Sequence, residues 1–222
     1  MSLPLMIFAA GKGTRMAPLT DVTPKPLIRV GDQTLLDRAL DLGRVAGAGP
    51  VVVNIHHLGQ QIRDHISPDI AISDESDLLL ETGGGLRKAL PLLGPGPVIT
   101  MNPDVVWTGP NPIAALLSAW RDDMDALLML VPLAQTHGRQ GGGDFSLGAG
   151  NRLIRKGDLV YGGAQIIRPD RLAEIPEDIF SLNRLWDLLI AEGRAHGLIH
   201  PGAWCDVGRP DCIPLAEGLL GG

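Results

Sequence analysis

Residues 5–27 read LMIFAAGKGTRMAPLTDVTPKPL. The apolar run Leu5–Ala9 has the length of a buried strand, and a glycine-rich loop follows it directly. Open α/β sheets bind ligands at the carboxyl ends of their strands, so the loop is predicted to border a ligand site. Gly11 and Gly13 let the backbone approach a phosphate closely, and successive N–H groups there can bind an anion. Three basic residues add positive charge, namely Lys12, Arg15 and Lys25. The segment therefore predicts a phosphate-binding loop suited to a triphosphate.

Two common phosphate-binding motifs do not match this loop. A dinucleotide fingerprint needs a third glycine where Met16 stands, and a helix that begins inside the loop. Three prolines make such a helix unfavourable, namely Pro18, Pro24 and Pro26. A Walker A loop needs Gly-Lys-Ser/Thr after four intervening residues, and the sequence has none.

Short β-branched runs alternate with helical patterns along the rest of the chain, which is typical of βαβ units. Strands are predicted at residues 5–9, 51–55, 70–72, 97–101, 126–131 and 204–207. Helices are predicted at residues 34–46, 58–66, 85–93, 112–121, 185–192 and 210–220. Short strand-like segments at 144–147, 152–154 and 159–167 indicate a small antiparallel insertion. The pattern predicts an α/β fold, with a mostly parallel, Rossmann-like sheet flanked by helices, as one domain over residues 1–222.

Composition excludes several other classes of protein. Of the 222 residues, 45% are hydrophobic and 20% charged, which excludes a disordered chain. The net charge of −6 and the scattered basic residues argue against a nucleic-acid partner. Cys205 and Cys212 are too few for a disulfide framework. No stretch reaches the roughly 18–20 apolar residues of a membrane span, and no signal peptide is present, so we expect a soluble cytoplasmic protein.

The loop resembles the signature of a known enzyme family. Ala10-Gly11-x-Gly13-Thr14-Arg15-Met16-x-Pro18-Leu19-Thr20, followed by Pro24-Lys25-Pro26-Leu27, is similar to the motif of the sugar-1-phosphate nucleotidyltransferases. The resemblance covers the whole chain and is closest to the short bacterial N-acetylmuramate α-1-phosphate uridylyltransferases. Segments 58–62, 80–94 and 204–208 support that subgroup. The resemblance implies an enzyme that joins a nucleoside triphosphate, UTP, to a sugar-1-phosphate, namely N-acetylmuramate 1-phosphate or a related hexose phosphate, and releases pyrophosphate. Mannose-1-phosphate with GTP and glucose-1-phosphate with dTTP or UTP are alternatives.

The resemblance also implies roles for individual residues. Arg15 would grip the triphosphate, and Lys25 would contact the phosphate of the sugar. Asp104 and Asp206 would bind Mg²⁺, which prefers one or two carboxylates together with substrate phosphates. The implied nucleotide-binding residues are Ala10, Gly11, Lys12, Gly13, Thr14, Gly83 and Gly84. The implied sugar-binding residues are Glu81, Asn102, Tyr161 and Gly162, with the antiparallel insertion forming the sugar pocket.

The sequence departs from the family pattern at two places. Pro103 stands where the family has glycine, and residues 200–203 lack a basic side chain that could meet a sugar carboxylate. The chain also lacks the carboxyl-terminal β-helix of longer relatives, so we expect a monomer or weak dimer.

Two other classes of protein do not fit the sequence. A nucleotide-sugar sensor would lose its metal ligands, whereas Asp104 and Asp206 are both present. An NAD-dependent oxidoreductase would need an acidic residue after the second strand, which ends at Asn54-Ile55-His56-His57.

Overall fold

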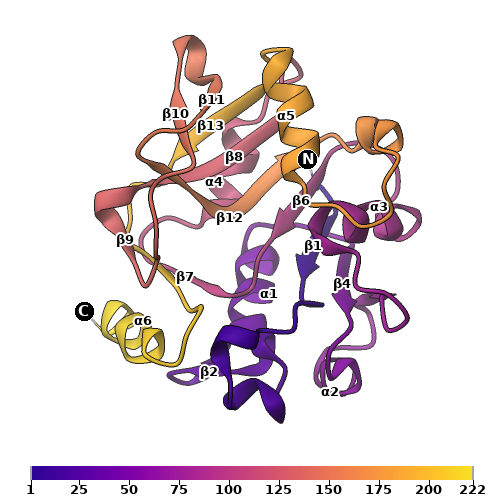
Figure 1. Ribbon diagram of the computed structural model, residues 1–222, viewed down its shortest axis with the longest axis vertical. Coiled ribbons are helices and arrows are strands. Elements are labelled where there is room, and N and C mark those ends of the chain that lie inside the picture. Colours follow the sequence, from indigo (N-terminus) through magenta and orange to yellow (C-terminus); the bar gives the residue numbers. More distant parts are fainter. Residues whose placement is uncertain (1, 222) are drawn as a thin grey trace.

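The computed structural model describes residues 2–221 and contains a central sheet of nine strands (Figure 1). Seven of them follow one another across the sheet in the order β5-β4-β1-β6-β12-β8-β13, and the hairpin β10–β11 extends β12. The strands are β1 (Leu5–Phe8), β4 (Val51–Ile55), β5 (Ala71–Asp74), β6 (Val98–Met101), β8 (Ala126–Pro132), β10 (Phe145–Leu147), β11 (Leu153–Arg155), β12 (Leu159–Ile167) and β13 (Ala195–Ile199). All neighbouring pairs among β5, β4, β1 and β6 are parallel, as is β8 with β13. The predicted mostly parallel α/β sheet is confirmed.

The antiparallel region differs from the expected insertion in one respect. β12 lies inside the central sheet, where it runs antiparallel to both β6 and β8. Only the short hairpin β10–β11 projects beyond it. β13 was not predicted from the sequence, because its segment AHGLI contains glycine and histidine and gives a weak strand pattern. Parallel pairing with the buried strand β8 stabilises it nevertheless.

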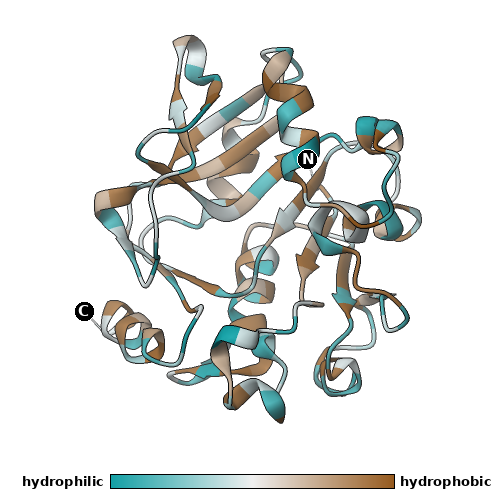
Figure 2. Ribbon diagram, viewed as in Figure 1, coloured by the Kyte–Doolittle hydropathy of each residue, from teal (hydrophilic) through white to brown (hydrophobic). Residues whose placement is uncertain are grey.

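Helices cover both faces of the sheet, and alternate side chains of β1 mark the two faces. Leu5 and Ile7 pack in one hydrophobic cluster with residues of α1 and α4, whereas Met6 packs in another with residues of α3 and α5. Brown, hydrophobic strands in the middle of Figure 2 show this buried layer. The helices are α1 (Leu35–Val45), α2 (Gly59–His65), α3 (Glu81–Leu93), α4 (Pro112–Ala119), α5 (Asn183–Ala191) and α6 (Cys212–Leu220). α3 begins four residues before the predicted start at residue 85.

A second, three-stranded sheet joins the end of the chain to the rest. It has the order β7-β14-β9, formed by β7 (Val105–Trp107), β14 (Trp204–Asp206) and β9 (Thr136–His137). α6 packs against β14 and also lies beside the short strand β2 (Arg29–Val30), as the yellow and indigo ribbons show at the lower left of Figure 1. β2 itself forms a hairpin with β3 (Gln33–Thr34). The buried side chains of Met16, Val106 and Cys205 share one cluster, so residues from both ends of the chain pack together.

The loop after β1 contains no α-helix between residues 9 and 28, as its prolines predicted. It folds instead into three 3₁₀ turns, η1 (Thr14–Met16), η2 (Leu19–Asp21) and η3 (Lys25–Leu27). Met16 is fully buried and fixes the loop to the core. None of the helices in residues 2–221 has the length and apolar character that crossing a membrane requires.

Two helical glycines provide a test of how closely α1 packs on β1. A Cβ at Gly43 would lie 2.4 Å from Cδ2 of the buried Leu5, whereas a Cβ at Gly218 in α6 meets no atom within 4 Å. Gly43→Ala is therefore expected to lower the free energy of unfolding by about 1–3 kcal/mol, the usual cost of overpacking. Gly218→Ala should instead raise it by about 0.5–1 kcal/mol through helix propensity. Urea unfolding of both variants measures the difference; stabilisation by Gly43→Ala would contradict the packing.

Candidate active site

Two adjoining hollows lie at the carboxyl ends of β1 and β6. The first hollow has a volume of about 450 Å³ and is bordered by the loop after β1 and the start of α3. The second has a volume of about 330 Å³ and is bordered by β12, α5 and β14. Six residues border both hollows: Phe8, Arg15, Thr82, Asn102, Asp104 and Ser181. The two hollows therefore form one cleft, with Asp104 and Arg15 on the boundary between its halves.

The predicted phosphate-binding loop borders the first hollow. Five of its residues do so: Ala10, Gly11, Gly13, Thr14 and Arg15. Gly13 adopts a φ of 61°, and a Cβ there would lie 2.9 Å from Cβ of Lys25 and 2.9 Å from Cγ2 of Thr20. The hydroxyl of Thr20 donates a hydrogen bond to the Gly13 carbonyl oxygen over 3.0 Å. Glycine at this position thus lets the loop fold back on Lys25. Lys12 is exposed and borders neither hollow.

Lys25 forms an ion pair with Asp104 inside the cleft. Its Nζ lies 2.5 Å from Oδ2 of Asp104, and the lysine is only 9% exposed. Lys25 begins η3, held between Pro24 and Pro26. Because a buried ammonium requires a compensating charge, Asp104 holds Lys25 at the boundary between the two hollows.

Strand pairing brings the second predicted acidic residue next to the first. Asp206 on β14 lies opposite Val105 on β7, and the N–H of Val207 donates to the Asp104 carbonyl oxygen over 2.9 Å. Both aspartates border the second hollow. Burial raises the pKa of the Asp206 carboxyl, and the negative charge of Asp104 raises it further. Three cations act on it in the opposite direction: Lys25, Arg15 and Arg139. Two carboxylates therefore face the cleft in an arrangement that favours a bound cation.

These two aspartates fit a hard divalent metal ion. Within residues 2–221 no side chain donates a hydrogen bond to either carboxylate oxygen of Asp206. The same part of the chain holds no cluster of three or more His, Cys, Asp or Glu side chains arranged to bind a metal. A site with two protein carboxylates leaves further coordination positions for water and phosphate oxygens, which is the environment that Mg²⁺ prefers.

Arg15 lies beside the second of these aspartates. A Cβ at Gly208 would lie 3.0 and 3.2 Å from the two carboxylate oxygens of Asp206 and 3.3 Å from Nη1 of Arg15. The absence of a side chain at Gly208 thus leaves room for the guanidinium and the carboxylate to approach each other. Arg15 is exposed toward the cleft, where its donors can meet a polyanion.

The glycine run at the start of α3 lies behind the cleft rather than in its lining. The N–H groups of Gly83 and Gly84 both donate to the Phe180 carbonyl oxygen, over 2.8 and 3.1 Å. A Cβ at Gly83 would lie 2.4 Å from the Phe180 ring, and one at Gly84 would lie 2.3 Å from the Asp178 carbonyl oxygen. The resemblance implies that Gly83 and Gly84 bind the nucleotide, but neither residue borders the first hollow and both N–H groups are already paired with the protein. The residues of this segment that border the first hollow are Glu81 and Thr82.

Glu81 occupies a strained position at the edge of the cleft. Its φ is 60°, a left-handed conformation that side chains other than glycine adopt at a cost. It is the first residue of α3 and borders the first hollow but not the second. The resemblance assigned Glu81 to the sugar, whereas its position is on the side of the phosphate-binding loop.

A buried polar network that sequence reasoning missed supports the first hollow. The Ala9 N–H donates to Oδ1 of Asn54 over 2.7 Å, and Nδ2 of Asn54 donates to Oε1 of Glu75 over 2.6 Å. The other oxygen of Glu75 accepts the Leu80 N–H over 3.0 Å. Glu75 is fully buried, and a Cβ at Gly85 would lie 2.7 Å from its Oε1. The sequence signal was a polar residue at the carboxyl end of each of two neighbouring strands, β4 and β5.

The predicted sugar-binding residues Asn102, Tyr161 and Gly162 border the second hollow. The Asn102 N–H donates to the Gly163 carbonyl oxygen over 2.7 Å, which joins the end of β6 to β12. A Cβ at Gly162 would lie 2.3 Å from the Trp107 ring, and Nε1 of Trp204 donates to the Gly162 carbonyl oxygen over 2.8 Å. Two tryptophans from the small sheet therefore support this side of the cleft.

Comparisons with known proteins agree with this geometry. The family model described as a MobA-like NTP transferase domain matches residues 5–217. An N-acetylmuramate alpha-1-phosphate uridylyltransferase of Caulobacter vibrioides is 39% identical over 97% of this chain and 96% of its own. Another from Neisseria meningitidis serogroup B is 36% identical, with 97% of each chain covered. The chain therefore belongs to the MobA-like NTP transferase family and is a sugar-1-phosphate nucleotidyltransferase, as its signature loop predicted.

A solved structure has the same fold. A UDP-glucose pyrophosphorylase complexed with UDP-glucose has a TM-score of 0.80 and 15% identity, with 99% of this chain and 98% of that chain covered. At this identity the similarity concerns the fold, which agrees with the Rossmann-like sheet described above.

Asp206 should destabilise the protein while no cation is bound. Because the pKa of Asp206 is raised in the fold, its ionised form is less favourable there than in the unfolded chain at neutral pH. Asp206→Asn in EDTA is therefore expected to raise the Tm by about 2–4 °C, the shift that corresponds to about 1 kcal/mol. Asp122→Asn, at a fully exposed carboxylate, is the control and should leave the Tm unchanged. A lower Tm for Asp206→Asn in calorimetry would contradict this account.

Proposed function

We propose that this protein transfers the uridylyl group of UTP to N-acetylmuramate α-1-phosphate, which gives UDP-N-acetylmuramate and pyrophosphate. The main support for the proposal is that Lys25 and Arg15 lie beside Asp104 and Asp206, where the two hollows of the cleft meet. Two polyanionic substrates can react there only if cations offset their repulsion. The uridylyltransferases that are 39% and 36% identical to the chain support the choice of both substrates.

The two hollows divide the substrates between them in this proposal. UTP occupies the first hollow, with its phosphates on the backbone of Gly11 to Thr14 and near Arg15. The sugar occupies the second, against Asn102, Tyr161 and Gly162. Their volumes of about 450 and 330 Å³ suit a nucleotide and a hexose phosphate. The reacting phosphates then meet at the boundary that Asp104 and Arg15 form.

The reaction needs no nucleophile from the protein. A phosphate oxygen of the sugar attacks the α-phosphorus of UTP, a new phosphorus–oxygen bond forms, and the bond to the bridging oxygen of pyrophosphate breaks. Catalysis then consists of holding both groups in line and stabilising the charge that develops. Lys25 binds the phosphate of the sugar once that phosphate displaces or shares its contact with Asp104, and Arg15 binds the triphosphate.

Magnesium is the cofactor of the proposed reaction. Asp104 and Asp206 hold the ion, which neutralises phosphate charge when bound. The lining of the first hollow also favours a pyrimidine. Glu81 and Thr82 offer polar groups at its edge, held in place by the buried pair Asn54–Glu75 beneath, and a purine would leave some of them unpaired.

We further propose that the chain acts in the cytoplasm as one domain over residues 1–222, as a monomer or weak dimer without nucleic-acid or membrane partners. We also propose that the reaction, which gives a UDP-linked amino sugar acid, serves the recycling of peptidoglycan sugars. The continuous sheet and the contact of α6 with β2 support the description as one domain.

A matrix of substrates tests the function. UTP, dTTP, GTP and ATP are each combined with the 1-phosphates of N-acetylmuramate, N-acetylglucosamine, glucose and mannose, and pyrophosphate release is measured in the presence of Mg²⁺. The expected result is the highest kcat/KM for UTP with N-acetylmuramate 1-phosphate, at least about tenfold above GTP and ATP. Preference for GTP with mannose-1-phosphate, or for dTTP or UTP with glucose-1-phosphate, would assign the enzyme to those alternatives. Absence of turnover with every pair would favour a sensor.

Substitution of the boundary aspartate tests the metal assignment. Asp104→Asn keeps the shape of the side chain and removes the charge that would hold Mg²⁺, so kcat is expected to fall about a hundredfold or more. Turnover by Asp104→Asn within about threefold of the unchanged protein would contradict its role as a metal ligand.

Lys25→Met should raise the KM for the sugar phosphate and also lower kcat. Asp122→Asn serves again as the exposed control.

A further inference from the structure

Three arginines border the second hollow, namely Arg15, Arg139 and Arg155. They differ in how many of their N–H groups already donate hydrogen bonds to the protein. Arg155 donates through Nε to Asp187, through Nη1 to the Asn183 side chain and through Nη2 to the Asn183 carbonyl oxygen, over 2.8–3.1 Å. Its guanidinium also lies 4.9 Å above the Phe145 ring. Arg155 is therefore fixed in the wall, while Arg15 lies at the phosphate boundary beside Asp206.

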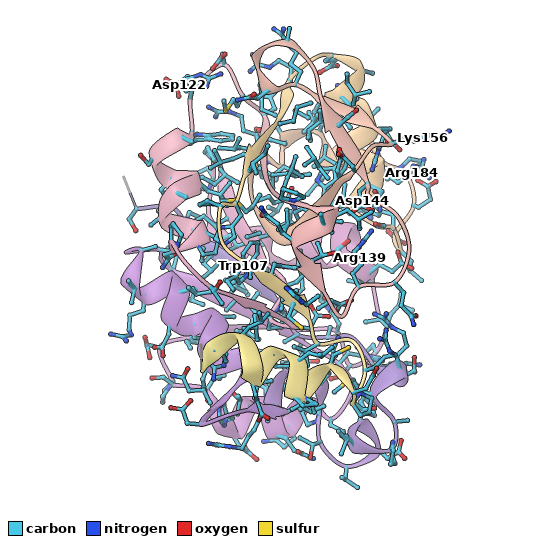
Figure 3. All side chains as sticks on the ribbon, turned by 90° about the vertical axis from the view of Figure 1, so that its left-hand side faces the viewer. Trp107, Asp122, Arg139, Asp144, Lys156 and Arg184 are labelled. Carbon is cyan, nitrogen blue, oxygen red and sulfur yellow. The ribbon has the colours of Figure 1, made fainter. Side chains whose placement is uncertain are left out.

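Arg139 donates hydrogen bonds through Nε and Nη2 but not through Nη1, among the residues that the structure describes. Its Nε and Nη2 donate to the Gly142 carbonyl oxygen over 3.2 and 3.0 Å, and Nη2 also donates to Oδ1 of Asp144 over 2.8 Å. Figure 3 shows the Arg139 and Asp144 side chains next to each other. Among residues 2–221, none accepts a hydrogen bond from Nη1. The Arg139 side chain is 23% exposed and borders the second hollow, so both donors of Nη1 remain accessible to a ligand.

Asp144 fixes this arginine to the sugar side of the cleft. Its second oxygen, Oδ2, accepts the N–H of Tyr161 on β12 over 2.9 Å. Both carboxylate oxygens of Asp144 are thus engaged, one by Arg139 and one by the backbone next to Gly162. The Arg139 guanidinium and the Tyr161 N–H compensate the negative charge of Asp144, which reduces its repulsion of an anion that approaches Nη1.

We propose that Arg139 is a specificity residue that binds the carboxylate of an acidic sugar 1-phosphate through Nη1. The inference rests on the proposed function and adds the group that distinguishes muramate from neutral sugars, which residues 200–203 do not provide. A carboxylate entering the hollow loses water, and a preorganised guanidinium replaces those hydrogen bonds with charge-assisted ones. A neutral sugar gains nothing from the same group.

A matched pair of substrates isolates this contact. N-acetylmuramate 1-phosphate and its carboxamide have nearly the same shape, but the carboxamide lacks the negative charge and has an NH2 donor in place of one oxygen; kcat/KM is measured for each with UTP. The unchanged protein is expected to prefer the acid by at least about tenfold. Arg139→Met should reduce kcat/KM for the acid by at least about tenfold and that for the carboxamide by less than about threefold. Arg139→Lys should restore part of the preference, since it keeps the charge.

A control variant separates this role from a structural one. Arg184→Met removes an arginine of α5 that pairs with Glu177 over 2.8 Å, is about half exposed and borders neither hollow. It should leave both kcat/KM values unchanged. Equal losses for both substrates in Arg139→Met, or no loss, would overturn the assignment of Arg139 while the proposed function stands. An unchanged protein that uses only neutral sugar phosphates would overturn the proposed sugar itself.

Discussion

β7 and β14 pair antiparallel, and this pairing sets Asp206 opposite Val105, the residue that follows Asp104. The strands are short, and their stability comes from the cluster in which Val106 and Cys205 pack with Met16 of the phosphate-binding loop. The apolar contacts that fix the loop therefore also fix the two carboxylates. Anything that loosens this cluster would separate the acidic residues from each other and from the glycine-rich loop after β1.

The charged groups of the cleft differ in how fully they are paired with other protein groups. Lys25 is paired with Asp104 over 2.5 Å, while the carboxylate of Asp206 has cations nearby but accepts no hydrogen bond from a side chain of residues 2–221. A buried ion pair contributes little net stability, because desolvation offsets most of the attraction. In the proposed reaction a phosphate would take the place of Asp104 at Lys25, and a metal ion the place of Lys25 at Asp104, so both charges would stay paired.

The sequence predicted those parts of the site that depend on local chemistry. Glycines and cations directly after a buried strand predicted the loop, and the resemblance supplied Asp104, Asp206 and Lys25. Asn54 and Glu75 were missed because each has a polar role only through a partner far away in the sequence. β13 and the central place of β12 were missed for a similar reason, since pairing with β8 stabilises segments whose own patterns are weak or ambiguous.

The glycine run at residues 83–85 shows why a glycine-rich segment next to a cleft need not contact its ligand. A Cβ at each position would collide with a different group, the Phe180 ring, the Asp178 carbonyl oxygen or the Glu75 carboxylate. The glycines therefore allow α3 to approach both the segment before α5 and the buried network under the first hollow. That close approach places Glu81, in its left-handed conformation, and Thr82 at the edge of the cleft. The glycines therefore act on the cleft only through the position of the helix, and Glu81 and Thr82 are the residues of this segment that border it.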